Sequence, residues 1–202
     1  DTFNKQLLAD SDISNSRRQV YGACFSYVTP RVPSNPKLLH YADELAETLG
    51  FLKEDIKSKD FLDMVSGSSV YPETQPYAMA YAGHQFGNWA GQLGDGRAIN
   101  LFEILHNNKR WTLQLKGAGE TPYSRTADGF AVLRSSIREH LCSEAMYYLG
   151  VPTTRSLSLV TTGDKVLRDV FYIGNAAYED RAAVCRVASS FIRLGKFLLF
   201  AD

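Results

Sequence analysis

Lys116 and Glu139 are side chains of opposite charge in segments whose patterns fix their surroundings. Residues 111–116 (WTLQLK) alternate between two faces, which predicts a β-strand that ends with Lys116 on its polar face. Glu139 lies at the edge of the apolar side of an expected helix, the side formed by Leu133, Ile137, Leu141, Ala145 and Leu149. A partly desolvated carboxylate favours a cation as its partner, which predicts an ion pair between the two residues. Taken singly, each is also explained as a solvated surface charge.

A glycine-rich stretch precedes this strand. Residues 83–96 (GHQFGNWAGQLGDG) hold five of the fifteen glycines, and Arg97 follows directly. Glycine lets backbone N–H groups approach a phosphate closely, and an adjacent arginine adds a charged fork. We expect Gly94 and Gly96 to act through that approach rather than through folding alone, although tight turns explain most glycine clusters. The order of glycine turn, strand lysine and helix glutamate is typical of protein-kinase-like lobes, whose lysine contacts nucleotide phosphates.

The elements that must position these residues are strands, one long helix and further strands, which together predict an α+β fold. A hairpin is predicted from strands at 98–105 and 110–116, joined through Asn107 and Asn108. A helix at 132–149, ended by Gly150, is expected to follow. The remaining expected elements are short strands at 157–161, 165–170 and 183–187, and a helix at 38–49 between Pro36 and Gly50.

The composition narrows the class of protein. The chain has 202 residues, and its 22 Lys and Arg balance its 22 Asp and Glu, which argues against nucleic acid as a partner. No apolar run is long enough to span a membrane. Its three cysteines are far apart, so we expect a reducing compartment: the cytoplasm, or the mitochondrion in a eukaryote. Cys142 and Cys185 are expected in the core, and the four scattered histidines have no metal-ligand spacing.

Longer strings are more specific than any of these motifs. GHQFGNWAGQLGDGRAI, LQLKGAGETPYSRTADGF and VLRSSIREHLCSEAMYYLGVPTTRS resemble the selenoprotein O family, also called YdiU, and VCRVASSFIRLG extends the match. Members of this family are protein adenylyltransferases of pseudokinase fold. The resemblance therefore implies a kinase-like N-lobe at residues 83–202, a family-specific extension at 1–82, and a C-lobe that is missing from this sequence.

The resemblance also implies an activity and a set of site residues. The family transfers AMP from ATP to Ser, Thr or Tyr hydroxyls of proteins with Mg²⁺ or Mn²⁺, and holds ATP inverted relative to kinases, with the γ-phosphate inward. Lys116 matches the family's phosphate lysine, and Glu139 matches the partner of that lysine. The other residues that match the family's ATP contacts are Gly94, Gly96, Arg97, Asp128, Gly129 and Arg186.

Two departures from the family pattern qualify these expectations. A second phosphate arginine is expected seven residues before Arg186, but Glu179 stands there, and Arg181 is an alternative if the alignment shifts. No catalytic-loop pattern follows Arg168, so the catalytic base and the metal ligands are expected beyond Asp202, and this chain alone is expected to be inactive. Its apolar end, from Phe191 to Phe200, is expected to pack on a following lobe. The alternative functions are a kinase-like phosphotransferase and a non-catalytic nucleotide-binding module.

Overall fold

The computed structural model describes residues 2–199, and within them nine strands form one sheet. The strands are β1 (Phe25–Tyr27), β2 (Lys37–Tyr41), β3 (Tyr77–Gln85), β4 (Asn88–Gly94), β5 (Ala98–His106), β6 (Lys109–Lys116), β7 (Ala131–Val132), β8 (Arg155–Arg168) and β9 (Ala177–Ala188). Their order is β1-β3-β5-β6-β9-β8-β2, with β4 paired to β3 and β7 to β9, and all these pairs are antiparallel.

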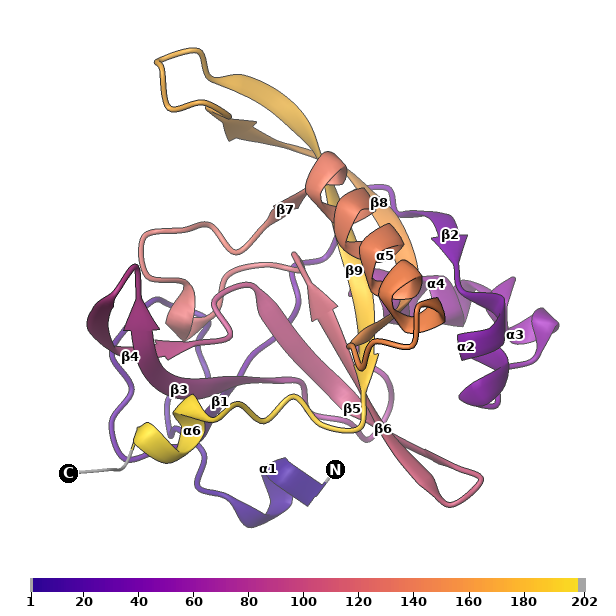
Figure 1. The fold of residues 1–202 in the computed structure, drawn as a ribbon, viewed down its shortest axis with the longest axis horizontal. Coiled ribbons are helices and arrows are strands. Elements are labelled where there is room, and N and C mark those ends of the chain that lie inside the picture. Colours follow the sequence, from indigo (N-terminus) through magenta and orange to yellow (C-terminus); the bar gives the residue numbers. More distant parts are fainter. Residues whose placement is uncertain (1, 200–202) are drawn as a thin grey trace.

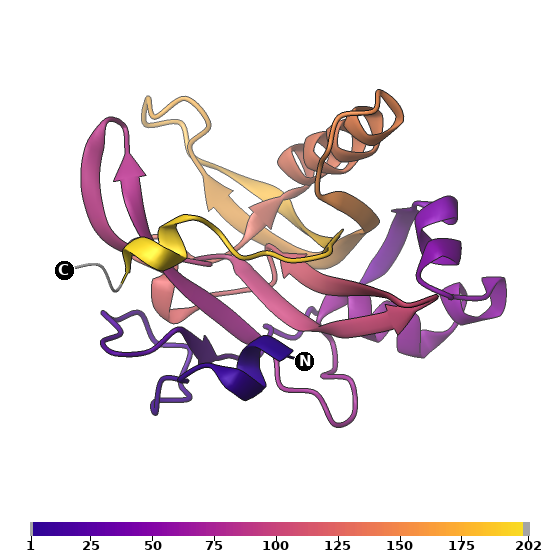
Figure 2. The ribbon, with the colours of Figure 1, turned by 60° about the horizontal axis from the view of Figure 1, so that its bottom comes forward.

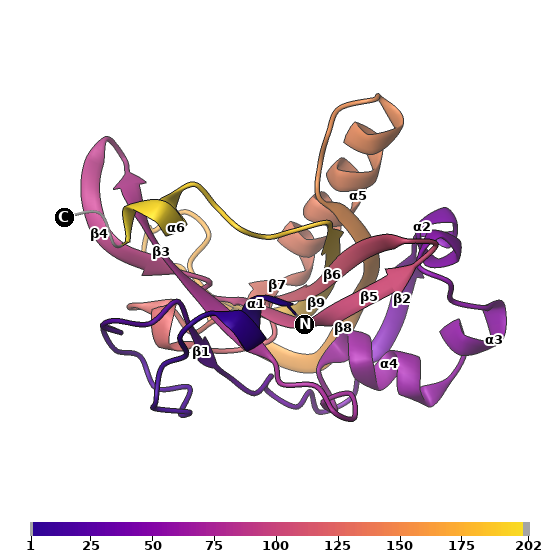
Figure 3. The same ribbon diagram turned by 90° about the horizontal axis from the view of Figure 1, so that it is seen from below.

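Helices cover both faces of the sheet (Figures 1 and 2). They are α1 (Thr2–Gln6), α2 (Asp43–Thr48), α3 (Lys53–Ile56), α4 (Lys59–Ser66), α5 (Leu133–Tyr148) and α6 (Gly195–Leu198), with a 3₁₀ turn, η1, at Pro122–Ser124. Figure 3 shows α5 on one side of the sheet and α4 on the other, and both contact β8 and β9. The α+β class expected from the sequence is therefore confirmed. None of the helices within residues 2–199 has the length and apolar character needed to cross a membrane.

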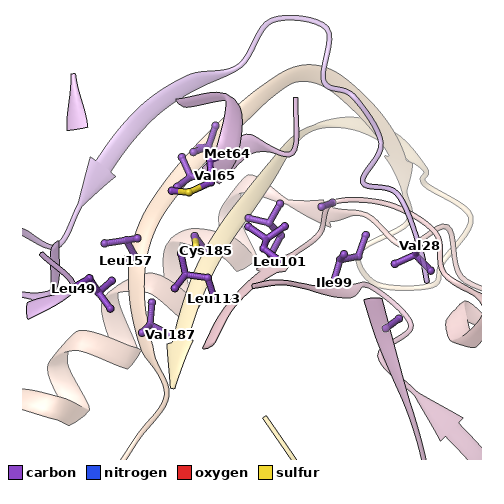
Figure 4. Packing of buried hydrophobic residues seen from close by; sticks show 14 of the residues in the cluster. Val28, Leu49, Met64, Val65, Ile99, Leu101, Leu113, Leu157, Cys185 and Val187 are labelled. Carbon is purple, nitrogen blue, oxygen red and sulfur yellow. The ribbon is translucent and has the colours of Figure 1, made fainter. Parts of the chain in front are cut away.

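The main apolar core fills the space between the sheet and α2–α4. Leu113 and Leu115 of β6 contribute fully buried side chains from the sheet, and Val65 does so from α4. Figure 4 shows this packing from close by, with side chains from β5, β6, β8 and β9 meeting those of the helices. The strands thus bury one face against helices, and their opposite face carries α5 and the candidate site.

Several predicted elements are confirmed. The β5–β6 hairpin turns at Asn107 and Asn108, which have φ of 49° and 57°, as a tight hairpin turn requires. Helix α5 ends where expected, and Gly150 follows with φ of 77°. The strands expected at 157–161 and 165–170 are one strand, β8, whose register with β9 shifts between Thr161 and Lys165.

Two segments differ from the prediction. The helix expected at 38–49 begins only at Asp43, because the residues before it form β2, whose backbone pairs with the edge of β8. Propensity and apolar spacing along residues 37–41 do not show that the edge of β8 is available for pairing. The glycine-rich stretch contains a hairpin of its own, β3–β4, which turns at Phe86 and Gly87. The expected domain boundary after residue 82 falls inside β3, and β2 pairs with β8, which follows that boundary.

Helix α5 presents a different face to the sheet from the one predicted. Its buried side chains are Ser136 and His140, whereas Ile137, Leu141 and Leu149 are 38%, 61% and 76% exposed. The small serine and the hydrogen-bonded histidine allow α5 to approach β8 closely, and His140 Nδ1 lies 2.6 Å from Ser156 Oγ. The apolar side that the sequence assigned to the core is therefore exposed along most of its length.

Two further expectations concern apolar residues. Cys142 on α5 is exposed, which corrects its assignment to the core, whereas Cys185 on β9 is buried as expected. Near the C-terminal end, Phe191 packs on a small aromatic cluster, while Leu194 and Phe197 are 85% and 72% exposed. Phe200 lies outside the described residues.

Candidate functional site

A cationic cavity of about 670 Å³ lies beside the β4–β5 turn. Its wall combines that turn, the end of β6, the segment 123–130, and single residues of β8 and β9. The positively charged residues that line it are Arg97, Lys116, Arg125, Arg168, Arg186 and Arg193. The acidic residues in the wall are Asp95 and Asp128, so cations dominate. Such a wall is suited to a ligand that carries several negative charges.

The β4–β5 turn is held tightly against η1. Thr121 Oγ1 donates a hydrogen bond to Asp95 O at 2.8 Å, and Ser124 Oγ donates to Gly96 O. A Cβ added at Gly94 would lie 2.3 Å from the Tyr123 ring, and one added at Gly96 would lie 2.7 Å from Tyr123 O. Both glycines are therefore required by protein packing. Packing contributes to the need for glycine at both positions, and their approach to a phosphate stays a prediction.

Lys116, Glu139 and Arg186 form a connected charge cluster at the inner wall. Lys116 Nζ lies 2.7 Å from Glu139 Oε2, and Arg186 Nη1 lies 3.4 Å from Glu139 Oε1. One carboxylate on α5 therefore holds a cation from β6 and another from β9. Burial lowers the pKa of Lys116, and the hydrogen bond that Lys116 donates to Glu139 opposes this shift. The predicted ion pair is present, and the strand-face argument places Lys116 correctly.

Arg186 retains unused hydrogen-bonding capacity. Its side chain is 13% exposed, and its Nη2 donates to Gln114 Oε1. Its Nε is buried without a hydrogen-bond partner among residues 2–199. A buried donor without a partner is costly, so this atom is an unsatisfied polar group at the inner wall of the cavity.

Asp128 and Gly129 form the opposite wall. Arg168 of β8 makes a bidentate contact with Asp128, at 2.7 and 2.8 Å. Burial raises the pKa of Asp128, but the hydrogen bonds from Arg168 and from the Phe130 amide outweigh it and lower that pKa overall. Gly129 has φ of 75°, and a Cβ there would lie 2.1 Å from Gly119 O, so only glycine fits.

The structure brings seven of the eight predicted site residues to this one cavity. These are Gly94, Gly96, Arg97, Lys116, Asp128, Gly129 and Arg186. Glu139 lies behind Lys116 and lines a smaller adjoining hollow that Arg97 and Lys116 share. Residues separated by almost a hundred positions thus meet, and their role in ligand binding stays a prediction.

The sequence did not single out three arginines of the wall. Arg168 ends β8, and only the pairing of β8 with β9 places it opposite Asp128. Arg193 lies with its guanidinium 5.0 Å from the centre of the Tyr81 ring. Arg125 has φ of 55° and ψ of −111°, an unfavourable backbone conformation, and donates to Gln85 Oε1 at 2.8 Å. Only the run SRTADG adjoining Asp128 hinted at Arg125.

A second phosphate arginine was expected at position 179 or 181, and neither Glu179 nor Arg181 lines the cavity. Glu179 makes a bidentate ion pair with Arg134, at 2.6 and 3.0 Å. Arg181 stacks over the Phe130 ring, 3.4 Å from its centre, and pairs with Asp164 at 3.4 Å. The extra guanidinium groups at the cavity belong instead to the three arginines named above.

The described residues lack a cluster of three or more His, Cys, Asp or Glu side chains able to hold a metal ion. The fold does bring two histidines together: His40 Nδ1 lies 2.9 Å from His140 Nε2 beneath α5. Sequence spacing gave no sign of this contact, because β2 and α5 are far apart along the chain.

The fold and the lining residues define an α+β protein with a cationic cavity beside the β4–β5 turn. A family model described as "Protein adenylyltransferase SelO" matches residues 12–201, so the chain belongs to the SelO family. Proteins of Flavobacterium johnsoniae, Methylobacillus flagellatus and Rhodopirellula baltica, each called "Protein nucleotidyltransferase YdiU", are 66%, 58% and 58% identical to it over 98–99% of its length. The chain spans only 37–39% of the length of these curated relatives.

Proposed function

We propose that this chain is the ATP-binding half of a protein adenylyltransferase, which transfers AMP to Ser, Thr or Tyr hydroxyls of protein substrates. One observation carries the proposal. In a chain of the SelO family, the glycine turn, the Lys116–Glu139 pair and the Asp128 loop converge on a single cationic cavity. Arg186 lines the same cavity and adds a guanidinium group for a phosphate oxygen.

The arrangement supports a kinase-like N-lobe. Lys116 lies on a central strand, the next helix supplies its carboxylate partner, and the glycine turn joins the two preceding strands, as in protein kinases. In this proposal Lys116 and Arg186 contact the phosphates, with Arg97 at the exposed rim. Glu139 acts through Lys116 by holding its ammonium group in place. Asp128 and Gly129 would meet the nucleotide from the opposite wall.

The proposed reaction is a substitution at the α-phosphorus. The acceptor hydroxyl oxygen bonds to that phosphorus, the bond to the oxygen that bridges the α- and β-phosphates breaks, and pyrophosphate leaves with that electron pair. The hydroxyl proton needs a base, which we propose lies beyond Asp202, together with the ligands for Mg²⁺ or Mn²⁺. This chain's own residues would bind the triphosphate and orient it, so that the α-phosphate faces the acceptor.

Isotope position in ATP separates this reaction from its alternatives. The full-length protein is incubated with Mg²⁺ or Mn²⁺, a heat-inactivated cell extract, and ATP labelled in either the α- or the γ-phosphate. We expect proteins to be labelled from α-labelled ATP only, and mass spectrometry to find AMP on hydroxyl side chains. Label from γ-labelled ATP would identify a phosphotransferase. ATP binding with neither label would identify a non-catalytic module.

The 202-residue chain alone is expected to bind ATP weakly and to label no protein, since we place the base and the metal ligands outside it. Its exposed Leu194 and Phe197 favour self-association at high concentration. Labelling by the purified chain that disappears in Lys116→Met would show that the catalytic residues lie within it.

A further inference from the structure

A row of polar side chains crosses the centre of the sheet on the side that carries α5. Asn100 of β5, Gln114 of β6 and Arg186 of β9 are register partners on three adjacent strands. Asn100 and Gln114 are 0% and 1% exposed, although each lies between apolar neighbours in its strand. Buried amides at such central positions need complete hydrogen bonding to be tolerated.

The hydrogen bonds along this row run in one direction. Arg186 Nη2 donates to Gln114 Oε1, and Gln114 Nε2 donates to Asn100 Oδ1 at 3.0 Å. Asn100 Nδ2 then donates to Asp95 Oδ2 at 3.3 Å and to Tyr77 O at 3.2 Å. The row therefore begins at a cation and ends at a carboxylate, and each amide uses both its donor and its acceptor end.

Both ends of the row belong to the cavity wall. Asp95 lies between Gly94 and Gly96, is 4% exposed, and also accepts a hydrogen bond from the Met79 amide at 3.1 Å. At the other end Arg186 contacts Glu139, which holds Lys116. The glycine turn and the phosphate-facing cations are thus joined through the interior of the sheet.

We propose that Asn100 and Gln114 are positioning residues, which hold the Arg186 guanidinium in its orientation and tie it to the glycine turn through Asp95. The inference rests on the proposed function, since it assigns these amides a task in binding the triphosphate. An arginine already oriented before the ligand arrives loses less conformational freedom on binding. An apolar residue at either position would fill the same space without orienting Arg186.

A double-mutant cycle tests this role in the full-length protein. The probe is α,β-methylene-ATP, whose α–β linkage cannot be cleaved, and the measurement is its Kd by calorimetry without a protein substrate. We expect Gln114→Met to raise the Kd about tenfold, the scale of one hydrogen bond to a charged group. In the Arg186→Met background the same change should raise the Kd less than about twofold, because the group it positions is gone.

Thr112→Val provides the matched control. Thr112 lies on the same face of β6 as Gln114 and is also buried, at 4% exposure, but takes no part in the row. We expect it to leave the Kd unchanged. If Gln114→Met does not fold, Gln114→Asn, which keeps the amide but shortens its reach, replaces it in the cycle.

The outcomes separate the two proposals. An equal rise in Kd in both backgrounds would mean that Gln114 acts on the fold alone, and would overturn the positioning role while leaving ATP binding intact. Failure of the unmutated protein to bind the probe would overturn the proposed function, and the positioning role with it. A tenfold effect that vanishes without Arg186 supports both.

Discussion

The two faces of strand β6 are both buried, yet they do different work. Leu113 and Leu115 point into the apolar core and are fully buried. Gln114, on the other face, is almost as buried, but it bonds to Asn100 and Arg186. On the apolar face, shape and volume decide which residue fits. On the polar face each group also needs a partner of the right kind and direction.

The polar face carries charges that burial disfavours. Burial raises the pKa of Asp95 and lowers the pKa of Lys116, so in both cases it acts against the charged form. Well-packed apolar residues in place of buried ion pairs often leave a fold as stable or make it more so. The difference indicates that β6 stabilises the fold through one face and arranges charge through the other.

The apolar face should give the largest change in stability. Leu113→Ala removes a fully buried side chain, so we expect the free energy of unfolding to fall by about 2–5 kcal/mol in urea titrations. The ATP affinity of the remaining folded protein should not change. If Leu113→Ala lowered ATP affinity with little loss of stability, the apolar face of β6 would also contribute to ATP binding.

The charge cluster should show the reverse pattern. We expect Lys116→Met to lower kcat/KM for AMP transfer by about 100-fold or more in the full-length protein, as removal of a preorganised electrostatic contact does. The cost in stability should stay below about 1 kcal/mol, because Arg186 still pairs with Glu139 and the lysine side chain is 25% exposed.

Glu139→Gln sharpens this test. It leaves Lys116 and Arg186 facing each other without the carboxylate between them, so it should cost more stability than Lys116→Met as well as activity. If Lys116→Met transferred AMP at the normal rate, Lys116 would have no role in the site.

Lys196 tests a buried charge that has no carboxylate partner within residues 2–199. It lies on α6, on the same side of the sheet as α5 (Figure 3), is 8% exposed, and donates to the carbonyl oxygens of Cys24 and Ala80. Burial lowers its pKa from 10.5 to about 8, while the carboxylate charge of Asp95 opposes the shift. Between these two values the unfolded chain binds a proton that the native chain has released, so stability should rise with pH.

The measurement compares the parent with Lys196→Met in urea titrations from pH 7.5 to 10.5. We expect the parent to gain about 2 kcal/mol relative to the variant over this range, somewhat less than the full shift gives, because the short α6 can detach before the chain unfolds. Parallel stability curves for the two proteins would show that Lys196 carries no such penalty.

The sequence predicted what depends on local pattern. The β5–β6 hairpin follows from alternation and two asparagines, and α5 follows from its length and Gly150. The strand period also places Lys116 correctly, and its predicted partner Glu139 is present although α5 buries a different face from the one expected. Family strings then brought in Asp128 and Arg186, which local pattern alone did not single out.

What the sequence could not predict depends on strand partners. β2 was expected to be helical because nothing local marks its pairing with β8. The register of β5, β6 and β9 creates the row that leads from Arg186 to Asp95, and the fold brings Arg168 to Asp128. Asn100 did carry a signal, as an amide between Ile99 and Leu101, whereas Gln114 only continues the polar alternation of β6. The meaning of both residues required their neighbours across the sheet.

Gly96 contributes both to packing and to the candidate site, because its turn faces the cavity while its backbone packs on η1. A Cβ at Gly96 would lie 2.7 Å from Tyr123 O and 3.1 Å from Ser124 Cα, both backbone atoms that cannot rotate away. We therefore expect Gly96→Ala to cost about 1–2 kcal/mol of stability and to weaken ATP binding.

In the control Gly83→Ala, the added Cβ would lie 4.0 Å from its nearest neighbour and should cost almost nothing. Thermal unfolding with and without ATP separates the two effects. If Gly96→Ala melted like the parent without ATP and lost only the ATP-induced rise in Tm, phosphate approach rather than packing would explain the glycine.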